Sequence, residues 1–474
     1  MATTYLYRAQ GTPTGAGKKA TVSCWVKMSV GGGSRGFFES RNAATTHSFD
    51  VYADGDKIQV GILESSSWVG YLTASGKSYD SSAWYHVCCV WDSTQAAAGD
   101  RFQLWVNGVQ PALGTETIPS QDQTSTALSS SVSTTQQWGK YAQTGTSYLD
   151  GYMAQCVYVD GAAYAVTTFG AFDATTGEWK PKSDGEIRTA VTFGDQGCLL
   201  PFSNASYLGY DYQTSDRSGT TNDFTVTGSG YKAQDNPSNN FCTLNNNYSA
   251  TGQYSTAGNT TTYANLAGYP AAGNNGLAAT MGASKGKWYW ESRPVSASTM
   301  TGMMSGSAAA LGSYDPSYAD GFTNYGGNKA IMYGTEAGAG YLMGVTTSTA
   351  AFGTILNNST DVVGVAMDLD NNNLYFSVNG TWQNSGVPTS GATGTGAVAI
   401  TVQSGQPALG KEFWLPALHT FSSSSTVEFN FGQGYFGTTS VGATNADDAG
   451  QGVFKYDVPA GFYALCTRNL KTYG

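Results

Sequence analysis

The sequence predicts an all-β protein built from two antiparallel β-sandwiches in tandem. Alternating apolar and polar residues recur in short segments such as Phe102-Gln103-Leu104-Trp105-Val106, and no segment keeps the apolar spacing of an amphipathic helix over three turns. Charged residues make up only 12% of the chain while Gly, Ser, Thr, Asn and Tyr are abundant, which is typical of short strands joined by tight turns. A length of 474 residues exceeds what one hydrophobic core usually organises, so we expect at least two domains.

The first domain is predicted to cover residues 1–205. Its early strands are expected at 20–27, 37–40, 48–52 and 57–62, with the spacing of about ten residues that is usual for sandwich strands and turns. An Asp-Gly pair between the last two of these strands predicts a hairpin turn.

The most specific motif of this domain is Trp84-Tyr85-His86-Val87 followed by Trp91-Asp92, and then a strand that ends in Val106-Asn107-Gly108. Asn-Gly favours a two-residue type I′ turn. The pattern resembles the laminin-G-like family of concanavalin A-like sandwiches, and residues 148–161 resemble the returning strand of that family. The resemblance covers about residues 1–200 and implies an antiparallel sandwich of jelly-roll type for this part of the chain.

A polar connecting segment is predicted at 206–239, and a second domain at 240–474. The second domain contains Gly286-Lys287-Trp288-Tyr289-Trp290-Glu291, then strands at 361–370 and 373–380. These segments resemble the SPRY family, which is another concanavalin A-like sandwich. Residues 300–341 are rich in Gly, Ala and Tyr and depart from the SPRY pattern.

A laminin-G-like unit followed by a SPRY-like unit resembles an arrangement in tail-fibre and capsid-associated proteins of marine bacteriophages. The resemblance implies a virion structural protein, made in the host cytoplasm, that assembles with other virion proteins and displays lectin-like sandwiches for attachment to host-surface glycans. A homo-oligomer is expected because virion projections commonly lie on symmetry axes. One alternative is a purely structural assembly or stabilising protein without a ligand, and a distant one is a secreted glycan hydrolase.

Charge and apolar content argue against several other classes. A net charge of -10 without a Lys/Arg cluster disfavours binding to nucleic acid and to anionic lipid. No apolar run is long enough to insert into a membrane, and the first eight residues do not form a secretory leader. Seven cysteines without C-x-x-C spacing predict buried free thiols.

The sequence predicts a protein that is not an enzyme. Glycoside hydrolases of the laminarinase type need two carboxylates on one strand in an E-x-D-x-x-E pattern, and this pattern is missing. The glutamates are scattered singly along the chain. The three histidines have no acidic or cysteine partner nearby in sequence, and His86 is expected to be structural.

Calcium is the one cofactor that the resemblance suggests, because laminin-G-like relatives often hold this ion between loops. A hard cation needs several oxygen ligands. The candidate ligands are Asp54, Asp56, Asp92, Asp100 and Asp150. Asp is also the usual residue of turns, and no spacing here dictates a shared site, so both interpretations remain open.

Saccharide recognition uses an exposed aromatic face that stacks on sugar C–H groups, with polar side chains that read the hydroxyls. Aromatic residues in two turn-rich stretches are therefore candidates, although many aromatics will simply fill the cores. The candidate ligand-binding residues are Trp68, Tyr71, Tyr314, Tyr318, Tyr325 and Tyr333.

Overall fold

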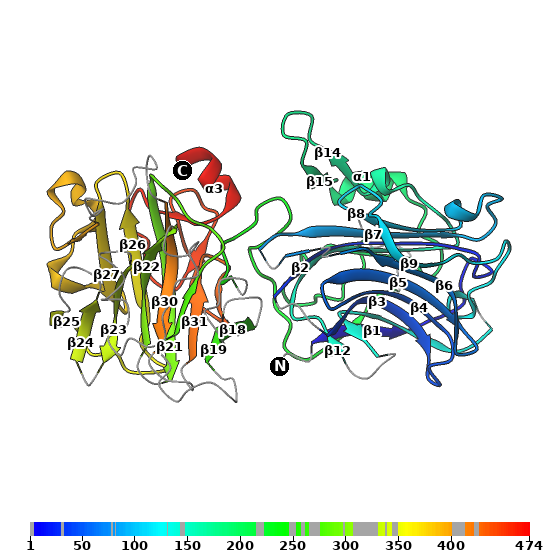
Figure 1. Cartoon of the computed structure of the whole chain (residues 1–474), viewed down its shortest axis with the longest axis horizontal. Coiled ribbons are helices and arrows are strands. Elements are labelled where there is room, and N and C mark those ends of the chain that lie inside the picture. The colour runs from blue at the N-terminus through cyan, green and yellow to red at the C-terminus, as the bar shows by residue number, and fades with distance from the viewer. Residues whose placement is uncertain are drawn as a thin grey trace. The chain divides into compact units, whose positions relative to one another are not determined.

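The computed structural model divides the chain into two compact units, Met1–Lys232 and Ala233–Gly474 (Figure 1). The residues that it describes are 4–29, 33–76, 79–80, 82–129, 131–142, 147–214, 222–245, 253–256, 261–264, 275–296, 299–306, 330–336, 339–343, 349–400, 413–420 and 426–474.

The first unit is a sandwich of two antiparallel sheets (Figure 1). The larger sheet has the strand order β17-β1-β10-β3-β4-β5-β6-β9, and the smaller has the order β16-β13-β2-β7-β8. The larger sheet consists of β1 (Tyr5–Ala9), β3 (Ser34–Asn42), β4 (Ser48–Asp54), β5 (Lys57–Glu64), β6 (Ser67–Ala74), β9 (Leu113–Thr117), β10 (Thr134–Trp138) and β17 (Thr225–Thr227). The smaller sheet consists of β2 (Lys19–Met28), β7 (Tyr85–Asp92), β8 (Phe102–Val106), β13 (Gly151–Asp160) and β16 (Cys198–Leu200).

The main core of the first unit lies between these two sheets. Val22, Cys24 and Val26 alternate along β2 and pack in one cluster with Val51 of β4 and Val60 of β5. All five side chains are fully buried. Because strand side chains point alternately to opposite faces, the intervening residues of the larger sheet form an outer face that is directed away from this core.

A second apolar layer covers the outer side of the smaller sheet. Ile187 packs there with Trp25 and Val157. Helix α1 (Asp184–Ala190) begins with a capping box, in which Ser183 and Glu186 each accept a hydrogen bond from the backbone N–H of the other. The layer also contains η3 (Val166–Thr168), β14 (Gly170–Phe172) and β15 (Trp179–Pro181). Two further short elements of the first unit are η1 (Ala98–Asp100) and η2 (Thr126–Leu128), and the buried residues of η2 pack in the main core.

His86 ties this layer to the smaller sheet. Its Nδ1 accepts a hydrogen bond of 3.1 Å from the indole N–H of Trp179, and its Nε2 lies 2.8 Å from Ser23 Oγ. Since an indole nitrogen can only donate, the proton of the neutral ring is on Nε2 and is shared with Ser23. Burial lowers the pKa of His86 to about 3.

The second unit contains two further sheets. One has the order β18-β19-β31-β21-β26-β27-β28, with β29 beside β27 and β36 parallel to β21, and the other has the order β20-β30-β22-β23-β24-β25. The first sheet is formed by β18 (Gln253–Thr256), β19 (Thr261–Ala264), β21 (Lys287–Ser296), β26 (Val363–Asp368), β27 (Asn373–Val378), β28 (Thr381–Trp382), β29 (Val398–Ala399), β31 (Thr426–Asn430) and β36 (Tyr463–Ala464). The other is formed by β20 (Asn275–Ala278), β22 (Thr299–Ser305), β23 (Ala330–Glu336), β24 (Ala339–Met343), β25 (Thr349–Gly353) and β30 (Trp414–Thr420).

Strand β21 carries side chains into two packed layers. Trp288 and Trp290 are fully buried in the core between the sheets, and Tyr289 packs on the opposite side. Glu291 accepts hydrogen bonds from the backbone N–H groups of Lys455 at 2.9 Å and Tyr456 at 2.8 Å. Smaller elements complete the unit: η6 (Gln383–Ser385), η7 (Pro388–Thr393), β32 (Tyr435–Phe436), β33 (Thr439–Ser440), β34 (Asn445–Ala446), β35 (Val453–Phe454) and α3 (Thr467–Tyr473).

These sheets confirm the predicted all-β sandwich class. The Asn107-Gly108 pair has two positive φ angles, 48° and 77°, as a type I′ turn requires. All seven cysteines are buried and none forms a disulfide. Among the described residues, no helix has the length and apolar content to cross a membrane.

The segment 206–239, predicted as a connection, contributes to both units. Strand β17 pairs with β1 at the edge of the larger sheet, and Asp211 accepts a hydrogen bond of 2.9 Å from the backbone N–H of Leu199. The unit boundary lies between Lys232 and Ala233.

Candidate functional site

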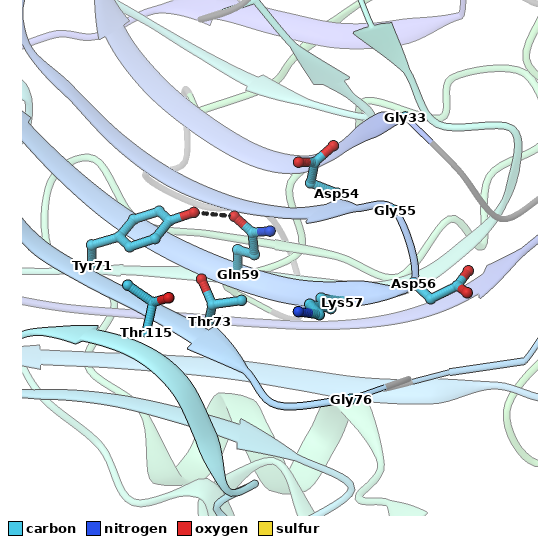
Figure 2. Close-up of a pocket in the computed structure, with 10 residues that line it drawn as sticks. All are labelled: Gly33, Asp54, Gly55, Asp56, Lys57, Gln59, Tyr71, Thr73, Gly76 and Thr115. Atoms are coloured by element: carbon cyan, nitrogen blue, oxygen red, sulfur yellow. Dashed lines mark hydrogen bonds between the residues drawn. The ribbon is translucent and has the colours of Figure 1, made fainter.

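The outer face of the larger sheet in the first unit holds an open hollow of about 750 Å³, which we call the first hollow (Figure 2). It lies over β5, β6 and β9 and reaches the β4–β5 turn. Its lining residues are Gly33, Asp54, Gly55, Asp56, Lys57, Gln59, Tyr71, Thr73, Gly76 and Thr115.

An aromatic pair stands at one side of the first hollow. The rings of Trp68 and Tyr71 lie 5.3 Å apart between centroids, at an angle of 43°. The indole lies directly on Gly61 of the neighbouring strand, where a Cβ atom would come within 2.4 Å of it. The hydroxyl of Tyr71 donates a hydrogen bond to Gln59 Oε1 (Figure 2).

A β-bulge places both rings on the same face. Residues three apart on a regular strand point to opposite faces of the sheet. In the β5–β6 ladder, Ile62 pairs with Gly70 while Leu63 pairs with Trp68, so Val69 is an extra residue. Because the bulge absorbs this extra residue, Trp68 stays on the same face as Tyr71, whereas Val69 packs against the core.

The opposite end of the first hollow is formed by the β4–β5 hairpin. Gly55 has a φ of 59°, which the tight turn requires, and Asp54 and Lys57 are paired across it. Asp54 accepts a hydrogen bond of 3.1 Å from Ser34 Oγ. Figure 2 shows Asp54 and Asp56 at the far end of the hollow from Tyr71.

A smaller hollow of about 190 Å³, the second hollow, lies on the same outer face over β1, β10 and β3. Strand β11 (Lys140–Tyr141), which pairs with β12 (Ser147–Tyr148), borders it. Strand β11 runs so close to β3 that a Cβ on Gly36 would lie 2.0 Å from the carbonyl carbon of Lys140. The residues that line the second hollow are Tyr5, Tyr7, Arg41, Asn42, Ala43, Thr135, Gln137 and Lys140.

Two carboxyl groups meet on this face in a way that the sequence did not reveal. Glu39 and Asp50 are direct partners across β3 and β4, and both are fully buried. Glu39 accepts hydrogen bonds from Gln137 and from the backbone N–H of Ala142, while Asp50 Oδ1 has no hydrogen-bond partner. Burial raises the pKa of both groups, and their mutual repulsion raises that of Asp50 further.

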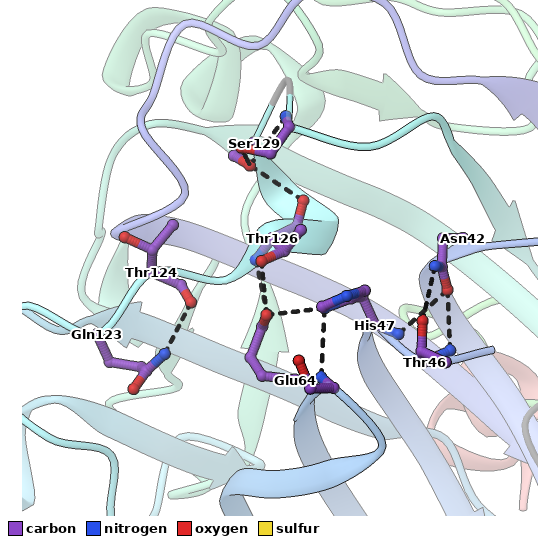
Figure 3. A network of polar contacts seen from close by, with 10 residues as sticks. Asn42, Thr46, His47, Glu64, Gln123, Thr124, Thr126 and Ser129 are labelled. Atoms are coloured by element: carbon purple, nitrogen blue, oxygen red, sulfur yellow. Dashed lines mark hydrogen bonds and ion pairs between the residues drawn. The ribbon is translucent and has the colours of Figure 1, made fainter. Parts of the chain in front are cut away.

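A polar network anchors the β3–β4 turn beside the second hollow (Figure 3). Asn42 Oδ1 accepts hydrogen bonds from the backbone N–H groups of Thr46 at 3.0 Å and His47 at 3.1 Å. His47 Nδ1 lies 2.9 Å from the Glu64 carboxylate, which also accepts from the N–H and the hydroxyl of Thr126, both at 2.6 Å. The network fixes one wall of the second hollow from three separate segments of the chain.

The structure brings together only part of the predicted aromatic set. Trp68 and Tyr71 are in contact, and of the two Tyr71 lines the first hollow. Tyr333 is fully buried on β23, where its ring packs against Phe352 and Phe376, so it presents no face to a ligand. Tyr314, Tyr318 and Tyr325 lie outside the described residues.

The predicted calcium ligands are spread over separate places. Asp54 and Asp56 share the β4–β5 hairpin, whereas Asp92 accepts hydrogen bonds from Thr94 and Gln95 and pairs with Lys19 at 3.1 Å. Asp100 accepts from Gln103 at 3.4 Å, and Asp150 lies just before β13. Among the described residues no three His, Cys, Asp or Glu side chains gather at one point, and of the five aspartates only Asp54 and Asp56 lie on one hairpin.

Comparison with known proteins agrees with the fold of the first unit. Residues 3–162 match the model of the laminin G-like family Laminin_G_3, described as the Concanavalin A-like lectin/glucanases superfamily. The fold and this match define the first unit as a domain of concanavalin A-like type. No curated protein matches the chain.

Several solved structures are similar at low identity. The crystal structure of the TRIM65 PSpry domain has 13% identity and a TM-score of 0.26, and the match covers 40% of this chain and 91% of that one. The SPRY domain of human HERC1 has 13% identity and a TM-score of 0.23, with 36% and 87% covered. The native heptameric SAP-like pentraxin from Limulus polyphemus has 16% identity and a TM-score of 0.27, with 38% and 86% covered.

Proposed function

We propose that the first unit binds a saccharide in the first hollow. The observation that carries the proposal is the Trp68–Tyr71 pair beside an open hollow of about 750 Å³. Aromatic faces stack on the C–H groups of sugar rings, and the amide and hydroxyl groups of Gln59, Thr73 and Thr115 supply partners for sugar hydroxyls. A volume of this size is typical of small-molecule sites.

We further propose that the chain is a bacteriophage virion component, either a capsid decoration or a tail-fibre element, that attaches to host-surface glycans. The tandem arrangement of the two sandwiches supports this role. An open hollow gives weak binding at each site, and many copies on one particle convert weak sites into strong attachment. Other virion proteins and further copies of this chain are the partners that such a role needs.

We propose binding without catalysis. A glycosidase needs two carboxyl groups that flank the scissile bond of its substrate. The carboxyl pair that strand register creates on this face, Glu39 and Asp50, is fully buried and therefore cannot contact a glycosidic oxygen. A purely structural virion protein is the second candidate, and it requires no ligand in the first hollow.

Saccharide binding is tested with Tyr71→Ala and Tyr71→Phe, by titration of the hits from a glycan array. Loss of the ring should weaken binding about tenfold, or roughly 1.4 kcal/mol, and the phenylalanine variant should retain most of the affinity. Phe172→Ala is a matched control, because Phe172 is 53% exposed and lies on β14, away from the outer face of the larger sheet. Equal affinities of all four proteins, or no bound glycan, would reject the site.

The virion role is tested separately, by protein mass spectrometry and cryo-EM of purified phage particles. Density for this chain on the capsid or at a fibre tip supports the proposal. Its absence from purified particles overturns the virion role and leaves the saccharide site to be judged by the titrations alone.

A further inference from the structure

We infer that the second hollow is an anion subsite that takes a carboxylate or sulfate group of an acidic saccharide. Its lining includes two cationic side chains, Arg41 and Lys140, and no Asp or Glu. The first hollow differs, since Asp54 and Asp56 accompany its single lysine. That the ligand is a saccharide rests on the proposed function. That the ligand carries an anionic group rests on the second hollow alone.

Arg41 brings positive charge to the second hollow, although part of its guanidinium is engaged. Its Nε lies 3.5 Å from Glu39, a carboxyl group that already accepts hydrogen bonds from Gln137 and from the N–H of Ala142. Nη1 of Arg41 is buried and has no hydrogen-bond partner, while the side chain as a whole is 22% exposed. A guanidinium keeps its charge even when it is partly buried, so Arg41 attracts a carboxylate or sulfate group in the hollow.

Lys140 is held in place without being neutralised. Its Nζ lies 4.3 Å from the ring centroid of Tyr5 and 5.9 Å from that of Tyr148. The aromatic faces orient the ammonium group without an ion pair, although its charge also reaches the buried Glu39, whose pKa it lowers. Within the part of the chain that the structure describes, no carboxylate lies within ion-pairing distance of Lys140, so its charge is available to an anion at the second hollow.

Two cationic side chains in one hollow, Arg41 and Lys140, are unusual for a protein with this overall charge. The chain carries a net charge of -10, so a pair of incompletely neutralised cations stands out from its surroundings. Glu39 and Asp50 lie on the same face but are fully buried, and none of the residues that line the second hollow is Asp or Glu. The lining itself therefore carries only positive formal charge.

Size and position indicate one charged sugar of a longer chain. A volume of about 190 Å³ is enough for an anionic group and part of a ring, and Tyr7, which is 37% exposed, flanks it with an aromatic face. Arg41 on β3 and Gln59 on β5 share one sheet face, and two interstrand spacings separate their strands by about 10 Å. Arg41 is level with Leu63 of β5 through Ser48, four residues from Gln59, so about 13 Å along the strands is added to this separation. An extended saccharide of several sugars could thus engage both hollows.

The test uses the full chain and four probes: dextran, dextran sulfate, and galactose oligomers with or without oxidation to galacturonate. Affinities are measured calorimetrically at low and at physiological salt. Each anionic probe should bind at least about tenfold tighter than its neutral counterpart, and this preference should shrink with salt. A preference for only one of the two anionic probes also supports the site, and it shows whether the site takes a sulfate or a carboxylate group.

The variants are Lys140→Gln, Lys140→Arg and, as a control with the same change of charge, Lys471→Gln, an exposed lysine of α3 that lines neither hollow. Lys140→Gln should reduce the affinity for the anionic probe about five- to tenfold and leave the neutral probe unaffected, whereas Lys140→Arg should retain the anion preference. Equal losses in Lys140→Gln and Lys471→Gln would overturn the inference, because they would show a diffuse charge effect.

The two proposals fail in distinguishable ways. If neutral and anionic probes bind equally and Tyr71→Ala weakens both, the anion subsite is rejected and the proposed saccharide site stands. If anionic binding depends on Lys140 while Tyr71→Ala changes nothing, the anion subsite stands and the first hollow is rejected. A thermal melt of each variant confirms that it is folded.

Discussion

Replacing His86 by glutamine should lower the stability of the first unit at neutral pH but raise it in acid. At neutral pH the variant disturbs the hydrogen bonds to Ser23 and Trp179, which should cost about 1–3 kcal/mol. In acid the His86 imidazole destabilises the wild-type fold, because it takes up a proton below pH 6.5 in the unfolded chain but only near pH 3 in the folded chain. The stability of the wild-type protein is therefore lost as the pH falls through this window.

The size of the effect follows from the two pKa values. Each pH unit between 6.5 and 3 removes up to 1.36 kcal/mol, so the full window removes about 5 kcal/mol at pH 3. If the neutral-pH cost is about 2 kcal/mol, the stability curves of the wild type and the variant should cross near pH 5.

The assay is urea unfolding of the full chain followed by hydrogen exchange and mass spectrometry, which reports each unit separately. The second unit is an internal reference, because burial also lowers the pKa of its own His419 to about 3, and the His86 substitution leaves that residue unchanged. Parallel pH profiles for the first unit of both proteins would refute the reasoning.

Three further changes test other parts of the first unit. Glu39→Gln with Asp50→Asn should increase stability most at high pH, because burial raises both pKa values and the wild-type pair destabilises the fold as the pH rises through them; a pH-independent difference in urea midpoints contradicts this. Gly36→Ala should lower the free energy of unfolding by at least about 2 kcal/mol, since its Cβ would lie 2.0 Å from a backbone atom of β11, while Gly99→Ala, with open space around it, should be close to neutral; equal effects in thermal melts would count against this close packing. Glu64→Gln should lower stability by about 1–2 kcal/mol through loss of the contacts in Figure 3, and an unchanged melting temperature would show that the network is dispensable.

The sequence predicted what depends on local pattern. Alternation of apolar and polar residues gives the sandwich class, and Asn107-Gly108 gives its turn, because both effects act within a few residues. Tyr333 shows the limit of that reasoning: its Tyr-rich context predicts a loop, but β23 covers Ala330–Glu336 and turns its ring into the core.

The second hollow and the carboxyl pair depend on strand order, which local pattern does not contain. Alternation shows which side chains of one strand share a face, but only the pairing of β3 with β10 places Arg41 opposite Thr135. Glu39 and Asp50 likewise look isolated along the chain and become partners through register. Both features depend on which strands pair and in which register, and a single sequence carries no signal for either.

The bulge at Val69 makes the aromatic platform independent of the exact length of its strand. Two residues stand between Trp68 and Tyr71, where a regular strand has one between neighbours on the same face, and the bulge absorbs the extra residue. Deleting Val69 would leave the two rings two positions apart on a regular strand and therefore still on one face, whereas a regular strand that kept Val69 would turn the indole toward the interior. A sandwich of this kind can therefore gain or lose one residue here and keep its stacking surface, provided that the ladder gains or loses the bulge at the same time.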